Sequence, residues 1–388
     1  MGDLAEGAFH VLRLNSPALG WFPALQGLSW RITESNLPYA DLFFSPYLEK
    51  VVISPSPSWT SSGVPRDIVP VIASTVSALP ASTLQSLWVA YTEPWADLKE
   101  SLSSVALRCG PSLTQFISPI PLSDAAMNHL MQLPHLRVWR LEGPPPPCDS
   151  ALPSPPTFPP LTEFALAGGA TRGWISLFER LEGSVSSTQG VTPLSRMKES
   201  LRHLRSRNLG GSPDLVINVS FTSTVQIFRN LVSLCVDNYC HDGGRCTFKL
   251  NNDNVTKFAM ALPQLECLFL GNPCPGNTCA TTVACLLLIS VYCDKLRELE
   301  IHFNTAKIVE DFKDISEDPR FQKLRSRPRC PLSYLGIHKI PLTVDSPNFE
   351  VVVNGMVNIF PSLHHCTAAE DNLDWDEVSE RITERREM

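Results

Sequence analysis

A short phrase recurs along the chain and constrains its fold more than any other feature. The phrase is a leucine, two residues, an apolar residue, one residue and a second apolar residue. Clear copies begin at Leu25, Leu48, Leu84, Leu136, Leu161, Leu231, Leu265, Leu296 and Leu332. Weaker copies pair Leu113 with Phe116 and Leu363 with Cys366. Repetition of this kind indicates an array of similar units rather than one central core.

The segments between the phrases have apolar residues at helical spacing, and several of them end at a proline. Residues 253–262 stop before Pro263, 123–133 before Pro134 and 68–79 before Pro80, and 283–290 repeat the spacing. A helix, a stop and a short strand therefore form the unit. Stacking such units places a parallel sheet on one side and helices on the other. We predict an α/β fold, a leucine-rich-repeat-like solenoid with a curved parallel sheet.

The predicted solenoid covers residues 8–369 and is interrupted twice. Residues 144–160 include nine prolines in seventeen positions, a composition that can neither pair as a strand nor continue a helix. The 70 residues between Leu161 and Leu231 form the longest interval. We expect an irregular insertion at 167–214, with a helix near 174–181, followed by an irregular strand through Leu215, Ile217 and Val219.

The last residues, 370–388, predict an acidic helix that caps the final repeat. Trp375, Val378 and Ile382 fall on one helical face, and Asp374 is a candidate N-cap. The exposed ends of a repeat array require such caps, because their apolar faces have no neighbour. An acidic docking tail is the alternative interpretation.

Several runs resemble the repeat region of F-box proteins that are expanded in mushroom-forming fungi. They are 21–30 (WFPALQGLSW), 37–48 (LPYADLFFSPYL), 261–271 (ALPQLECLFLG), 296–303 (LRELEIHF) and 359–363 (IFPSL). The resemblance implies a substrate-recognition part of an F-box-like ubiquitin-ligase adaptor. The alternative is a ligase-independent scaffold, or a paralogue that lost its F-box. Because the repeats begin by Leu25, we expect no separate F-box and no binding of a Skp-type adaptor by this chain.

Charge and hydropathy exclude two classes of partner. The 32 Lys and Arg residues against 39 Asp and Glu give a net charge of −7, which argues against phosphate-driven nucleic-acid binding. The most apolar stretch, 283–293, is too short to span a membrane, which takes about 20 residues. No secretory signal is visible at the N-terminus. We expect a cytoplasmic or nuclear protein that binds neither nucleic acid nor membrane.

No motif of catalysis is visible, so we predict no enzyme and no cofactor. The chain lacks a phosphate-binding loop, a Gly-x-Ser-x-Gly elbow and a His-Glu-x-x-His helix. Cys240, Cys246, Cys274 and Cys279 could surround zinc if two loops aligned, but five residues separate the first pair, more than paired zinc ligands usually allow. We favour loop cysteines without a ligand role, with a disulfide or redox role as a further alternative.

Candidate binding residues follow from the period of a strand. If the apolar residues of each phrase point into the core, the residue between the last two faces outward. Trp88, Arg140, Phe269 and Glu300 occupy that position, and His302 and His338 lie two residues beyond it in their phrases. Trp, Phe and Arg commonly anchor protein interfaces. We therefore predict a protein partner on the concave face. The alternative is that a neighbouring loop covers Trp88 and Phe269.

Overall fold

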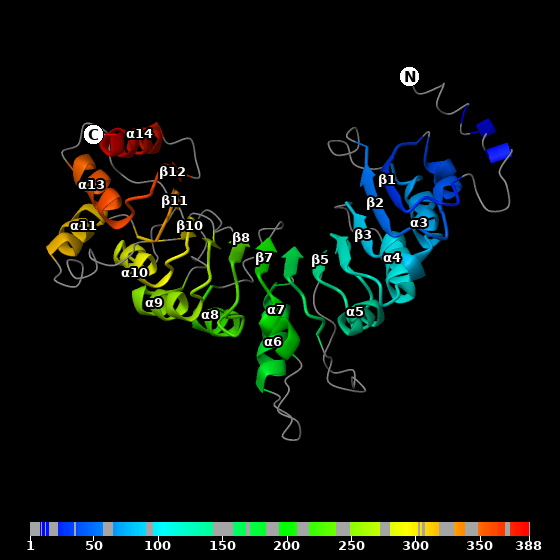
Figure 1. Cartoon of the computed structure of the whole chain (residues 1–388), viewed down its shortest axis with the longest axis horizontal. Coiled ribbons are helices and arrows are strands. Elements are labelled where there is room, and N and C mark those ends of the chain that lie inside the picture. The colour runs from blue at the N-terminus through cyan, green and yellow to red at the C-terminus, as the bar shows by residue number, and fades with distance from the viewer. Residues whose placement is uncertain are drawn as a thin grey trace. The chain divides into compact units, whose positions relative to one another are not determined.

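The structure, a computed structural model, describes most of the chain in segments. They are 22–34, 36–56, 65–90, 96–142, 158–167, 171–183, 194–207, 217–237, 249–271, 280–301, 303–304, 307–317, 330–337, 348–368 and 373–387, with scattered positions in 8–14. The chain forms two compact units, Met1–Ser200 and Leu201–Met388. Each unit is described by itself (Figure 1).

The first unit contains six parallel strands that follow one another in chain order. They are β1 (Gly27–Ile32), β2 (Lys50–Pro55), β3 (Ser86–Val89), β4 (Gln115–Ser118), β5 (Val138–Glu142) and β6 (Glu163–Ala167). The connecting helices are η1 (Leu37–Phe43), α3 (Val69–Ser77), η2 (Ala81–Thr83), α4 (Ala96–Arg108), α5 (Asp124–Gln132), α6 (Thr171–Gly183) and α7 (Ser195–Ser200).

The second unit repeats this plan with six further parallel strands. They are β7 (His203–Arg207), β8 (Ser233–Asp237), β9 (Cys267–Leu270), β10 (Glu298–Ile301), β11 (Tyr334–Ile337) and β12 (His365–Ala368). The helices are α8 (Val219–Val225), α9 (Asn252–Ala261), α10 (Ala284–Tyr292), α11 (Ile308–Glu317), α13 (Phe349–Ile359) and α14 (Leu373–Glu387). The predicted α/β class and the parallel pairing are confirmed.

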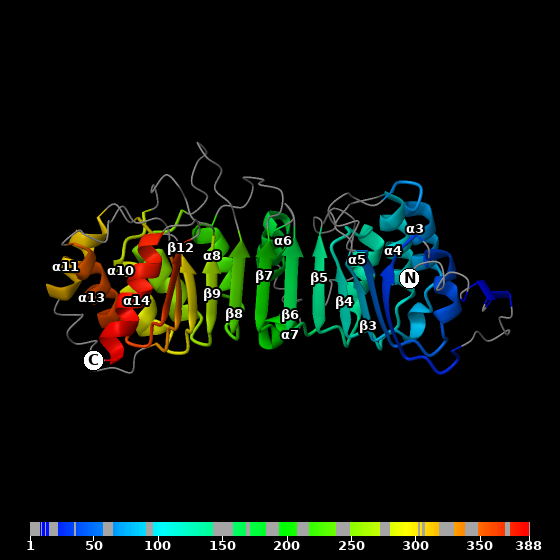
Figure 2. The ribbon, with the colours of Figure 1, turned by 90° about the horizontal axis from the view of Figure 1, so that it is seen from above.

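Each phrase of the sequence corresponds to one strand and the turn before it. The first leucine lies just before the strand, and the two apolar residues point to the side where the helices lie, as with Leu84, Leu87 and Val89, which have no exposed area. In Figure 2 the strands lie toward the viewer, with α4, α5 and α8 behind them. The weaker copies form β4 and β12, so they too are genuine members of the series.

The prediction for the interval between Leu161 and Leu231 is wrong in one respect. Val219 does not belong to the expected strand, because it begins α8, which the Asn218 side chain caps by accepting from the Phe221 N–H at 3.0 Å. Ile217 forms a single β-bridge, and Leu215 lies outside the described residues. The missing strand is β7, which falls inside the segment 167–214. Its phrase runs Leu201, Leu204, Ser206, and the buried serine in the last apolar position disguises it.

The predicted helices are confirmed, and local hydrogen bonds show why they begin where they do. The Ser123 hydroxyl accepts from the Ala126 N–H at 3.3 Å and so caps α5. At α9, Asn251 and Asn254 form a reciprocal capping box, with N–H to side-chain distances of 2.9 and 3.3 Å. The expected helix near 174–181 is α6.

The cores of the two units differ in composition. In the first unit, Trp139, Phe164 and Trp174 form a fully buried cluster with ring centroids 5.1–5.7 Å apart, and Phe178 joins it. In the second, successive strands place Leu204, Leu234, Leu268, Leu299, Leu335 and Cys366 in one register. Both arrangements bury the helix side of the strands that carry these residues.

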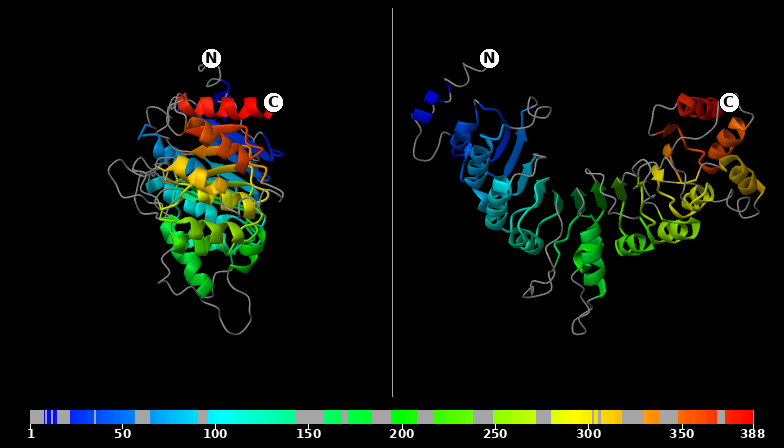
Figure 3. Two further views of the ribbon diagram at one scale, coloured as in Figure 1. Left: turned by 90° about the vertical axis from the view of Figure 1, so that its left-hand side faces the viewer. Right: turned by 180° about the vertical axis from the view of Figure 1, so that it is seen from behind.

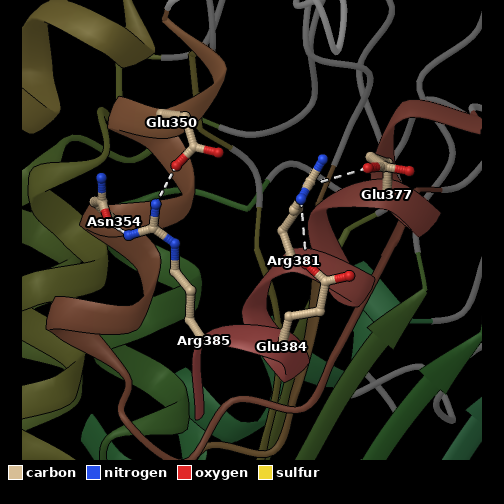
Figure 4. A network of polar contacts seen from close by, with 6 residues as sticks. All are labelled: Glu350, Asn354, Glu377, Arg381, Glu384 and Arg385. Carbon is tan, nitrogen blue, oxygen red and sulfur yellow. Dashed lines mark hydrogen bonds and ion pairs between the residues drawn. The ribbon is translucent and has the colours of Figure 1, made fainter. Parts of the chain in front are cut away.

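Helix α14, red in Figure 3, lies beside β12, the last strand. Val378 and Ile382 are buried, whereas Asp374 is not the N-cap, because it lies inside a helix that begins at Leu373. The side chain of Trp375 lies outside the described residues. Arg385 binds Glu350 and Asn354 of α13, and Arg381 pairs with Glu377 and Glu384, each at 3.2 Å (Figure 4).

Within the described segments, no helix has both the length and the apolar composition needed to cross a bilayer.

Candidate protein-binding face

In each unit, the sheet surface opposite the helices, called here the open face, carries predicted binding residues in one row. In the first unit the aligned residues are Ser29, Val52, Trp88, Ile117, Arg140 and Ala165. In the second they are Arg205, Cys235, Phe269, Glu300, Gly336 and Thr367. The structure thus places Trp88 and Arg140 in one row, and Phe269 and Glu300 in another.

Trp88 is the most prominent side chain of the open face in the first unit. It is 44% exposed, although it sits in the middle of a strand, and the aligned Val52 and Ile117 on either side are half-buried. The alternative that a loop covers Trp88 is therefore wrong. An indole beside two aliphatic side chains offers an apolar surface to a partner, at low entropic cost because the strand holds it.

Arg140 belongs to the same row but is committed to an ion pair. Its Nε lies 2.6 Å from Oε1 of Glu163 on β6, and both side chains keep contact with solvent. An exposed pair of this kind stabilises the fold by only about 0–1 kcal/mol. Its effect is to fix the guanidinium over the β5–β6 pair, where a partner would meet a pre-oriented planar group.

The second unit presents an aromatic track, the rings of Phe269, Tyr334 and His365. Phe269 and Tyr334 have centroids 6.4 Å apart at 45°, and Tyr334 lies 5.8 Å from His365. The Tyr334 hydroxyl is 2.7 Å from the Thr367 hydroxyl, which orients the ring. Phe269 is half-buried against this neighbour. Sequence reasoning missed Tyr334 and His365, although they lie two positions before the predicted row and so face the same side.

Glu300 lies across the neighbouring strand because that strand has a glycine. A Cβ atom at Gly336 would be 2.9 Å from Cγ of Glu300, closer than real side-chain contacts. Gly336 therefore makes the space in which the Glu300 side chain rests next to the aromatic track. Together, a carboxylate and aromatic rings suit a partner that offers both apolar and basic groups.

Five of the thiols in the described segments have a raised pKa. Burial raises the pKa of Cys109, Cys293, Cys330 and Cys366 to about 12. Cys267 lies on the open face. Partial burial is the main cause that raises the pKa of its thiol to about 11, and the negative charge of Glu298 is the second. Because the thiolate is the reactive form, these groups are inert near neutral pH.

Some predicted residues cannot be placed. His302, His338 and the four cysteines Cys240, Cys246, Cys274 and Cys279 lie outside the described residues, as does 144–157 of the proline-rich segment. Among the residues that are placed, no group of three or more His, Cys, Asp or Glu side chains could hold a metal ion.

No protein-family model matches this chain, and no curated protein is significantly similar to it. The open face is therefore the main basis for a functional proposal.

Proposed function

We propose that the chain is a leucine-rich-repeat-like solenoid that acts as a protein-interaction module and binds its partner through the open face. The observation that carries this proposal is Trp88, a large apolar side chain that remains 44% exposed within a hydrogen-bonded sheet. Aromatic and arginine side chains dominate the binding energy of protein interfaces. Trp88 and Arg140 supply these types in the first unit, and Phe269 and Tyr334 supply aromatic rings in the second, with the Glu300 carboxylate for specificity.

The strand ladder supports this proposal because it holds the side chains rigidly. Neighbouring strands are spaced at about 4.8 Å, so a row of side chains is presented at fixed intervals. Anchors on strands lose little conformational freedom when they bind, and that lowers the cost of association. The surface is also independent of the core, because the residues that point to the helices are different ones.

The experiment compares variants of the open face with matched variants on the helices. Trp88→Ala and Leu107→Ala each remove an exposed apolar side chain, 44% and 45% exposed, from β3 and α4 respectively. In the second unit, Phe269→Ala changes a half-buried residue of β9, and Met260→Ala, on the exposed side of α9, is its control. Immobilised variants are incubated with extract of the native cells, and captured proteins are quantified. We expect Trp88→Ala and Phe269→Ala, but neither control, to lose the captured partner. Equal capture by all variants would overturn the proposal.

The ligase context rests on the resemblance of the repeat runs and is the more specific form of the same proposal. In this form the open face holds a substrate for ubiquitylation. The alternative is a scaffold that works without a ligase. Co-capture of a Skp-type adaptor and a cullin with the protein from its own cells would favour the ligase. Capture of a partner without them would favour the scaffold. For the purified chain we expect no complex with the adaptor at micromolar concentration.

A further inference from the structure

The first strand, β1, has backbone groups along its outer side that no neighbour uses. The Gln26 carbonyl accepts from the Glu49 and Lys50 N–H groups at 2.8 and 3.0 Å, so the even-numbered residues of β1 face β2. Successive residues alternate, and Gly27, Ser29 and Arg31 therefore point away from the sheet. In the part of the chain that is placed, nothing binds the outward N–H and C=O groups of Gly27 and Ser29. The Arg31 carbonyl accepts from the Asn36 amide at 2.9 Å and keeps a second lone pair.

The apolar side of the same repeat is also incomplete. Leu25 and Leu28 are half-exposed, whereas the equivalent Leu48 and Val51 of the next repeat are fully buried. Phe22, just before the strand, is 41% exposed although it stacks on Phe43. At the outer edge of β1, the backbone groups therefore lack a partner strand and the apolar side chains are incompletely buried.

The last strand, β12, shows how this protein closes an edge. The outward N–H of Cys366 donates to the Ser379 hydroxyl at 2.8 Å, and that hydroxyl donates to the Cys366 carbonyl at 2.9 Å. One serine of α14 thereby occupies the groups that a further strand would use. An exposed strand edge without such a device is a template for pairing.

We propose that β1 pairs antiparallel with β1 of a second copy of this chain, about a two-fold axis at Ser29. The residues of the strand are complementary to themselves in this register. Ser29 faces Ser29, and Arg31, the only charged residue of β1, faces Gly27, which has no side chain to obstruct it. These are the outward-pointing residues, so each pair exchanges both its N–H and C=O groups.

The core side supports the same register. There Leu28 of one copy lies opposite Trp30 of the other, an aliphatic–aromatic pair that covers the half-exposed leucine. Since like residues meet only at the small, uncharged Ser29, the pairing brings no like charges together. A short strand and a few apolar side chains make a small interface, so we expect a weak dimer.

The test measures the mass of the full chain by sedimentation equilibrium at about 200 μM, a method that does not dilute the sample and so keeps a weak dimer populated. We expect the wild type to approach twice the chain mass of 42.9 kDa. Ser29→Lys and Ser29→Asp place like charges opposite each other, so each should be monomeric alone. An equimolar mixture of the two should dimerise again, because opposite charges then meet.

The control is Gln115→Lys, which adds the same charge at an exposed position of β4, between two strands and away from the edge. It should dimerise like the wild type. A wild type that is monomeric at this concentration overturns the proposal. So does a Ser29→Lys variant that still dimerises, or a mixture that stays monomeric. The wild type could instead be monomeric, with β1 amides that become protected from hydrogen exchange only when an extended peptide is added. That result would also overturn the proposal and would mean that the edge binds a strand of another protein.

Discussion

The two faces of the same strands differ in how far their neighbours constrain them. On the side of the helices, Leu87, Phe116 and Trp139 occupy adjacent strands at one register and have no exposed area. On the open face, the same strands carry Trp88, Ile117 and Arg140, which share neither size nor charge. Packing fixes the first row, because a cavity or a polar group there is costly. Packing does not fix the second row. Substitutions in the two rows should therefore differ in their effect on stability.

The largest expected effect is a charge introduced on the side of the helices, at the buried leucine just before β9. Leu265 has no exposed area, so Leu265→Asp would bury an unpaired carboxylate and lower the free energy of unfolding by roughly 4–5 kcal/mol. Denaturant titration measures the loss. The control, Gln264→Asp, changes the adjacent residue, whose side chain lies near Lys295, and should be almost neutral. Equal stability of the two variants would mean that the side of the sheet that faces the helices is not a core.

The aromatic cluster of the first unit should respond almost as strongly. Trp174→Ala removes a fully buried indole between Trp139 and Phe164 and should cost about 3–5 kcal/mol. Trp88→Ala removes the same side chain from the open face and should cost well under 1 kcal/mol in stability, as surface substitutions do. Thermal unfolding of both variants makes the comparison directly. A large loss for Trp88→Ala would place that residue in the core instead.

Opening the β12 edge should have the next largest effect on the free energy of unfolding. Ser379→Ala removes the hydroxyl that binds both the N–H and the C=O of Cys366. Leaving these groups unpaired should cost about 1–3 kcal/mol and increase the hydrogen exchange of β12. The nearby Thr383→Ala, which removes a hydroxyl bonded only within α14, serves as the control. Identical exchange of β12 in the two variants would show that Ser379 does not close the edge.

At neutral pH the smallest effect concerns the buried thiols, because their contribution to stability changes only above pH 9. Their pKa is raised from 9.0 to about 12 in the folded chain, so the folded form holds its protons more tightly than the unfolded form. Their stabilising contribution is therefore complete below pH 9 and is lost as the pH rises toward 12. Each thiol should contribute up to about 1.4 kcal/mol per pH unit in that window. Cys366→Ala should flatten the decline in unfolding free energy above pH 9. An unchanged slope would mean that this thiol ionises as easily in the folded chain.

The helix-side row was predictable from sequence and the open face only partly so. Repeated leucines revealed the strands, but Ser206 and Ser118, buried where apolar residues usually stand, weakened two phrases, and β7 was missed. The position of Trp88 followed from the period of a strand. The aromatic track did not, because the contact of Phe269 with Tyr334 joins β9 to β11, two repeats apart in the chain. The edge closure by Ser379 depends likewise on where α14 lies.

The most direct test of the open face is photocrosslinking from a single position in the native cells. Replacing Trp88 by the photoreactive p-benzoylphenylalanine keeps a large aromatic group on β3, and the same replacement of Leu107 puts it on α4 at equal exposure. If the open face binds the partner, irradiation should yield a defined adduct from position 88 and none from position 107. An adduct from position 107 alone, or none from either position, would contradict the assignment of binding to the open face.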